Sequence, residues 1–199
     1  MPKERIQDAI LDLRSAALRH LTTMPETGNN AKISIQVGLN GYLSLFTYKC
    51  TLVPKPFFNE AAALSLLSDV VSLDPGDTVS FVDVPQYDAV LLYADVKGSS
   101  ALPEMYYLLV SAAGRIGEYN KIAASYCDGR LYLVVAQGKS LMLCNSFAAA
   151  DFATAEYFIF MVLKKLQLNP EVSTIYFRTK LTEEDEMSLY RYFRAVEQI

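Results

Sequence analysis

The stretch Ile33-Ser-Ile-Gln-Val-Gly-Leu-Asn-Gly-Tyr-Leu-Ser-Leu-Phe-Thr-Tyr48 decides the fold that this sequence predicts. Asn-Gly is the strongest two-residue signal for a tight hairpin turn, because both central residues of a type I′ turn need a positive φ. We therefore expect a hairpin over residues 32–48, with Asn40 and Gly41 at its tip. Residues 122–135 repeat the plan with Asp128-Gly129 as the turn, and a helix-forming segment follows in both places.

The remaining apolar patterns extend each hairpin into a larger unit. We predict further strands at 49–53, 78–84, 87–96, 140–145 and 173–179, with the second hairpin formed by strands at 121–127 and 130–137. Helices are predicted at 3–21, 59–72, 103–113, 148–167 and 182–197. Three strands, a helix, a strand and a helix form the ribonuclease-H-like plan (βββαβα), with one extra strand in the first copy. Two such lobes in tandem make the actin-like ATPase architecture, an α/β fold whose ligand lies in the cleft between the lobes.

This order of elements predicts three parts. Residues 1–30 form an amphipathic N-terminal helix and a linker, residues 31–117 the first ribonuclease-H-like lobe, and residues 118–199 the second. We call the last two parts the first half and the second half. The apolar stripe of the N-terminal helix is expected to pack on the body of the same chain, with docking on a partner as the alternative.

Composition and charge disfavour several functions. The net charge is -4, and no group of Lys and Arg is larger than a pair, so a nucleic-acid partner is not expected. The N-terminus has no apolar signal core, and the apolar run 157–163 is too short to span a membrane. We therefore expect a cytoplasmic protein without a membrane partner, with Cys50, Cys127 and Cys144 as buried, reduced thiols. His20 is the only histidine, and no metal site is predicted.

Several of these segments also resemble an uncharacterised bacterial family, a domain of unknown function, that is assigned an actin-like ATPase fold. The resemblance is carried by residues 33–41, by Leu52-Val-Pro-Lys-Pro-Phe57 and by Leu141-Met-Leu-Cys-Asn-Ser-Phe147, with the later helices at 158–168 and 189–193. It covers nearly the whole chain after the linker. What it implies is the fold, because the family looks like one without an established activity.

The nucleotide chemistry of active actin-like ATPases requires an Asp-x-Gly turn at the end of each lobe's first strand. There the carboxylate holds the metal or its waters, and the glycine lets backbone N–H groups approach phosphate. No carboxylate lies between Lys32 and Tyr48, and the neutral amide of Gln36 supplies no charge for Mg²⁺. The same absence disfavours ribonuclease-H-type cleavage. Arg178-Thr179-Lys180-Leu181 stands where an active relative would present two glycines to adenosine.

We therefore predict a degenerate actin-like protein that acts as a binding or scaffold module. It has no catalytic residues and no cofactor, and it binds an unknown protein partner or a second copy of itself. The alternative is an ATP-binding protein or weak ATPase that holds ATP and Mg in the inter-lobe cleft. Its candidate contacts are Gly38, Asn40, Gly41, Asp128 and Gly129. The many Tyr and Phe side chains are expected to pack between elements, with an exposed recognition patch as the alternative.

Overall fold

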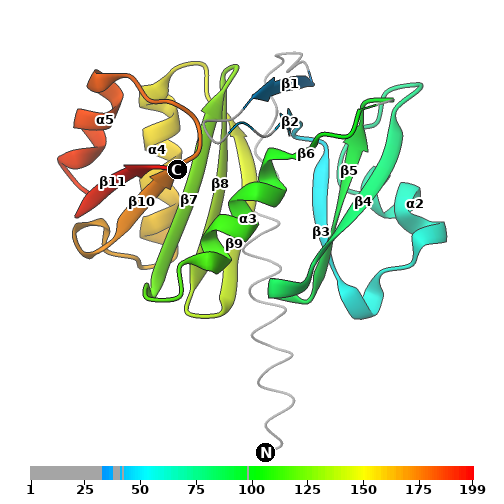
Figure 1. Cartoon of the computed structure of the whole chain (residues 1–199), viewed down its shortest axis with the longest axis horizontal. Coiled ribbons are helices and arrows are strands. Elements are labelled where there is room, and N and C mark those ends of the chain that lie inside the picture. Colours follow the sequence, from blue (N-terminus) through cyan, green and yellow to red (C-terminus); the bar gives the residue numbers. More distant parts are fainter. Residues whose placement is uncertain (1–32, 38–40, 42, 98) are drawn as a thin grey trace, which may run out of the picture. The chain divides into compact units, whose positions relative to one another are not determined.

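A five-stranded sheet forms the second half of the chain (Figure 1). The structure is a computed structural model, and it describes residues 33–37, 41, 43–97 and 99–199. The strands lie in the order β11-β10-β7-β8-β9. Their bounds are Asn120–Cys127 (β7), Arg130–Gln137 (β8), Ser140–Ala148 (β9), Thr174–Phe177 (β10) and Ala195–Gln198 (β11). β7, β8 and β9 form an antiparallel meander, whereas β10 is parallel to both β7 and β11.

Tight turns join the strands of this meander as the sequence predicts. Cys127 pairs with Arg130 across the β7–β8 turn, and φ is 50° at Asp128 and 71° at Gly129. Both central residues thus have the positive φ that a type I′ turn requires. The expected strands at 121–127, 130–137 and 140–145 are present, and β9 continues three residues further than predicted.

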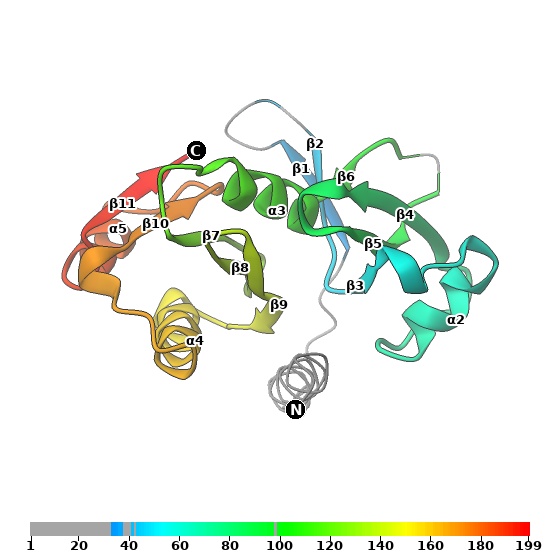
Figure 2. The ribbon, with the colours of Figure 1, turned by 90° about the horizontal axis from the view of Figure 1, so that it is seen from below.

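Two helices cover opposite faces of this sheet. α3 (Glu104–Gly114) packs on β7 and β8, and α4 (Phe152–Lys165) packs on β8 and β9. Figure 2 shows the two helices on either side of the meander. The side chain of Asp151 caps α4 by accepting a hydrogen bond from the backbone N–H of Thr154 at 2.7 Å, as helix N-termini require. α4 falls within the predicted segment 148–167, and α3 ends one residue beyond the predicted 103–113.

The first half divides its strands between two small sheets. One sheet contains β1 (Ser34–Val37), β2 (Leu43–Phe46) and β6 (Leu102–Pro103), and the other contains β3 (Cys50–Pro54), β5 (Ala89–Asp95) and β4 (Thr78–Val84). The predicted antiparallel pairing of β1 with β2 is present, and Gly41 has a φ of 79°. Val37 pairs with Leu43, so an odd number of residues separates the strands, and this register differs from that of the predicted two-residue Asn40-Gly41 turn. Gly38 and Asn40 lie outside the described residues. The three strands do not form one meander, because β3 pairs with the buried strand β5 and not with β2. The helix expected over 59–72 is shorter: α2 spans Ala63–Ser68.

The C-terminal segment corrects the sequence prediction. We expected one helix from Thr182 to about Glu197, but α5 ends at Tyr190 (Glu183–Tyr190) and the chain then forms β11. Phe193 and Val196 are both buried. The edge of β10 would otherwise leave backbone groups without partners, and β11 supplies a parallel ladder to it. Closing the sheet edge therefore outweighs continuing a polar helix.

The two halves share one hydrophobic core. Phe46 from β2 meets Tyr132 from β8 edge to face, with ring centroids 5.5 Å apart, and Leu91, Met105 and Val134 belong to the same buried cluster. A second cluster lies under α2, between that helix and β5. In the part of the chain that the structure describes, no helix is long and apolar enough to cross a membrane. The predicted helix at 3–21 and linker fall outside the described residues, and the lobe boundary near residue 117 stays a prediction.

Candidate functional site

The turn of the second half meets the first strand of the first half. The carboxylate Oδ2 of Asp128 accepts hydrogen bonds from Ser34 Oγ at 2.9 Å and from Gln36 Nε2 at 3.1 Å. Ser34 and Gln36 are alternate residues of β1, so their side chains leave the same side of the strand. Of the five candidate contacts predicted from the sequence, the structure describes Gly41, Asp128 and Gly129. Asp128 is the one with a side chain, and that side chain forms the two hydrogen bonds to β1.

This arrangement joins one carboxylate to two neutral donors. Asp128 is the only acidic residue in 33–48 and 118–130 apart from Glu118, which bonds Tyr176 elsewhere on the sheet. Mg²⁺ in phosphate sites is held by one or two carboxylates together with phosphate oxygens and waters. Asp128 supplies one such group, and its Oδ2 already accepts two internal hydrogen bonds. In the described part of the chain, no three His, Cys, Asp or Glu side chains are grouped as metal ligands would be.

A buried ion pair lies where β7, β10 and the start of α3 meet. Arg178 Nε donates to Glu104 Oε1 at 2.9 Å, and Ser125 Oγ donates to the same oxygen at 2.6 Å. Glu104 is 1% exposed and Arg178 is 5% exposed. Glu104 is also the first residue of α3, where the helix dipole favours a negative charge. The guanidinium of Arg178 lies over the Tyr107 ring at 4.8 Å.

The segment that follows β10 is bonded to β7 rather than free. Arg178 N donates to the Ala124 carbonyl at 3.0 Å, and Tyr126 N donates to Thr179 Oγ1 at 2.9 Å. This is the segment in which active relatives are expected to present glycines to adenosine. Sequence reasoning noted the missing glycines but missed the Glu104 pair. The signal available was a Glu directly after Pro103 at a predicted helix start, together with an Arg after an apolar strand.

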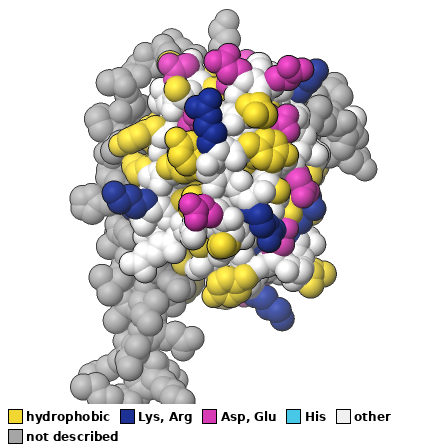
Figure 3. Space-filling model, turned by 90° about the vertical axis from the view of Figure 1, so that its left-hand side faces the viewer, with side chains coloured by type: hydrophobic (Ala, Val, Ile, Leu, Met, Phe, Trp, Pro, Cys, Tyr) yellow, Lys and Arg dark blue, Asp and Glu magenta, His cyan; other side chains and the backbone are white. Residues whose placement is uncertain are grey.

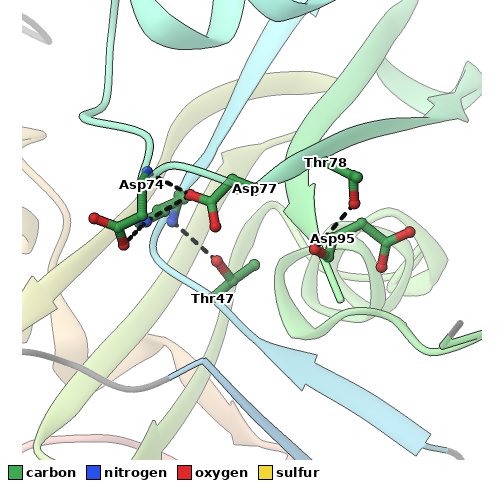
Figure 4. Close-up of polar contacts among 6 residues, drawn as sticks. Thr47, Asp74, Asp77, Thr78 and Asp95 are labelled. Atoms are coloured by element: carbon green, nitrogen blue, oxygen red, sulfur yellow. Dashed lines mark hydrogen bonds and ion pairs between the residues drawn. The ribbon is translucent and has the colours of Figure 1, made fainter. Parts of the chain in front are cut away.

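A second charged group ties the first half together. Lys49 Nζ donates to Asp74 Oδ2 at 2.6 Å and to Asp77 Oδ2 at 2.7 Å. Figure 4 shows the two aspartates beside Thr47, whose Oγ1 accepts from the Lys49 backbone N–H. Burial alone would lower the pKa of Lys49, but hydrogen bonds to the two carboxylates outweigh it and raise that pKa. The hydrogen bond from Lys49 lowers the pKa of Asp77. The ammonium is therefore protonated at neutral pH and cannot act as a nucleophile.

The same close-up shows a separate polar contact nearby (Figure 4). Thr78 Oγ1 donates to the backbone carbonyl of Asp95 at 3.3 Å. Outside that view, Asp95 Oδ2 accepts a hydrogen bond from Ser80 Oγ at 2.9 Å. These bonds link β4 to β5, which already pair antiparallel. They fix strand register.

The cysteines do not provide an activated thiol. Burial raises the pKa of Cys50 and Cys127 to about 12 and raises that of Cys144 well above its usual value. A thiolate is the reactive species, so these thiols are inert at neutral pH. All three are free and pack against the shared core.

Aromatic side chains are divided between packing and exposure. Phe147 and Phe158 stack between β9 and α4 with centroids 4.9 Å apart, whereas Tyr119, Tyr157 and Tyr192 are at least half exposed. Figure 3 shows that the apolar side chains on the α5 side occur in separate groups among charged and polar ones. Scattered exposure of this kind is ordinary for a folded surface.

The described part is thus a mixed α/β protein with the actin-like fold. A crystal structure from Bacteroides thetaiotaomicron VPI-5482, of a protein with an actin-like ATPase fold and unknown function, is similar to it with a TM-score of 0.62 and 17% sequence identity. The match covers 77% of this chain and 65% of that chain, so this chain spans less than two thirds of that structure's length. Identity this low supports the fold alone.

The family is given by a second comparison. Residues 42–196 match the model of a protein family of unknown function, DUF3822, and the chain belongs to that family. This agrees with the resemblance in the sequence. No curated protein matches the chain.

Proposed function

We propose that this protein is a non-catalytic member of the actin-like fold that serves as a binding or scaffold module. Its framework positions two halves around a common junction without turning over nucleotide. The partner is a protein or a second copy of the chain.

The observation that carries the proposal is the bonding of the polar groups at the junction to one another. Asp128 accepts from Ser34 and Gln36, and Arg178 is paired with Glu104. A nucleotide-binding cleft needs donors and a carboxylate directed at phosphates and metal. Here the corresponding groups have partners inside the chain.

Packing between the halves supports the same proposal. Phe46 and Tyr132 bring apolar rings together at the junction, and α3 continues that core. Such contacts stabilise the junction at about 25 cal/mol per Å² of apolar surface removed from water. A ligand between the halves would have to displace them.

The test is an ATP hydrolysis assay on the full chain, paired with isolation of its complexes. We expect phosphate release in Mg-ATP to equal that of an Asp128→Ala variant, and the chain to elute in a stoichiometric complex or as a dimer. Turnover that Asp128→Ala abolishes would support the ATPase alternative instead. A monomer with no stoichiometric partner would count against the scaffold role.

A further inference from the structure

Arg130 places a buried positive charge at the junction of the halves. It is the first residue of β8 and is 7% exposed. Because side chains alternate along a strand, Arg130 lies on the same face of the sheet as Tyr132, which contacts Phe46 of the first half. Its guanidinium lies over the Tyr48 ring at 4.5 Å, and its Nη1 donates to Ser146 Oγ at 3.3 Å.

No carboxylate forms an ion pair with Arg130 within the described residues. The four ion pairs formed there use other cations, and Arg130 Nε is buried without a hydrogen-bond acceptor. Asp128 is only two residues away, but its hydrogen bonds come from Ser34 and Gln36. An unpaired buried charge is costly, and natural proteins pair nearly all of them.

The thiol of Cys50 and the hydroxyl of Tyr132, on which the charge of Arg130 acts, remain neutral at physiological pH. Burial raises the pKa of the Cys50 thiol to about 12, although the positive charge of Arg130 acts in the opposite direction. Burial likewise raises the pKa of the Tyr132 hydroxyl, again against the effect of Arg130. Neither group therefore supplies a counter-charge.

The other buried cations of the described chain are handled differently. Arg178 meets a carboxylate, and so does Lys49. Lys121 is buried too, but its ammonium is not among the buried atoms that lack a partner. Among the buried cations of the described residues, Arg130 is therefore the one with a buried nitrogen, Nε, that lacks a hydrogen-bond acceptor.

We propose that Arg130, with Tyr48 and Ser146, forms a binding site for a small oxyanion, either a carboxylate or a phosphate. The guanidinium presents N–H donors in a fork that matches two oxygens of such a group. The Tyr48 ring fixes the plane of the fork through a cation–π contact. The Ser146 hydroxyl, which now accepts from Arg130, can also donate to the anion. This site is independent of the proposed scaffold function.

The first experiment compares thermal melting of the full chain in inorganic phosphate, in succinate and in chloride of matched ionic strength. We expect a saturable rise in Tm with phosphate, with succinate or with both. Arg130→Met should lose that rise, and its Tm in chloride should equal or exceed that of the unchanged chain, because an unpaired buried charge has been removed. Arg191→Met, which alters an exposed arginine, should keep the rise.

A second measurement needs no variant to fold. The ¹⁵N Nε–H resonance of Arg130 should shift and exchange more slowly as the anion is added to the unchanged chain. A response to one anion alone identifies the class of ligand. Absence of a saturable Tm rise together with an unmoved Arg130 resonance would overturn the proposal, as would an equal rise in Arg130→Met. Either failure leaves the hydrolysis test of the proposed function unaffected.

Discussion

Buried charges in the described chain occur where elements distant in sequence meet. Lys49 joins the loop at residues 74–77 to the start of β3, and Glu104 joins the start of α3 to the end of β10. Burying Lys49, Glu104 and Arg178 is costly, so the loss of a buried partner is more damaging than the net value of the pair suggests. The side chains involved are also those that a single sequence does not connect, because 74 residues separate Glu104 from Arg178.

The acid sensitivity of folding should depend on Asp77. Its folded pKa is lowered, so its contribution to stability is present above the unfolded value of about 3.9 and is lost as pH falls through the folded pKa. The pKa of Lys49 is raised in the folded state. Its contribution to folding stability is therefore fully present below the unfolded pKa of about 10.4, and it is lost as pH rises through the folded pKa. Asp77→Asn should therefore lose about 1–3 kcal/mol at neutral pH and show a flatter acid limb.

Urea unfolding over a pH series measures this effect. The matched control is Asp83→Asn, because Asp83 pairs with Lys55 in an exposed contact of 3.2 Å. That change should cost no more than about 1 kcal/mol. Equal losses of stability in both variants would mean that the buried Lys49–Asp77 contact stabilises the fold no more than the exposed Lys55–Asp83 contact does.

The Glu104–Arg178 pair should show strong coupling. Glu104→Gln leaves a buried Arg178 without its counter-charge and should cost about 3–5 kcal/mol, as should Arg178→Met. The double variant should lose clearly less than the sum, because neither charge is then left alone. A double-mutant cycle from denaturant unfolding checks this, and additive losses would contradict the pair as described.

At the element scale, turns were more predictable than strand partners. Asp128-Gly129 identified its hairpin because the φ requirement is local. The pairing of β3 with β5 could not be predicted, because it depends on a buried apolar strand almost forty residues away along the chain. The same limitation hid β11: a polar segment after a helix has no strong local preference, and the open edge of β10 decides its conformation.

The N-cap of α5 provides a test of one element. Thr182 Oγ1 accepts from the Asp185 backbone N–H at 3.1 Å. Thr182→Ala should cost about 1 kcal/mol, because that donor loses its partner. Thr182→Ser keeps an acceptor and should change the free energy of unfolding very little. Urea unfolding measures both variants. A loss of unfolding free energy as large in Thr182→Ser as in Thr182→Ala would show that the capping hydrogen bond does not stabilise α5.

At the scale of the whole molecule, the candidate site could be predicted only in part. The sequence identified Asp128 and its turn, and it showed that the first strand lacks a carboxylate. It could not show that Ser34 and Gln36, more than ninety residues away, would bond to that same Asp128. Nor could it show that both halves would build one core around α3. These contacts follow from the tertiary arrangement, which no local pattern encodes.

The most direct test of a non-catalytic junction is thermal melting of the full chain with and without Mg-ATP. A ligand that binds only the folded state adds about 2.7 kcal/mol of stability at 100 times its Kd, which a melting curve detects readily. We predict the same Tm in both conditions, for the unchanged chain and for Asp128→Ala alike. A saturable, Mg-ATP-dependent rise that Asp128→Ala abolishes would contradict the account.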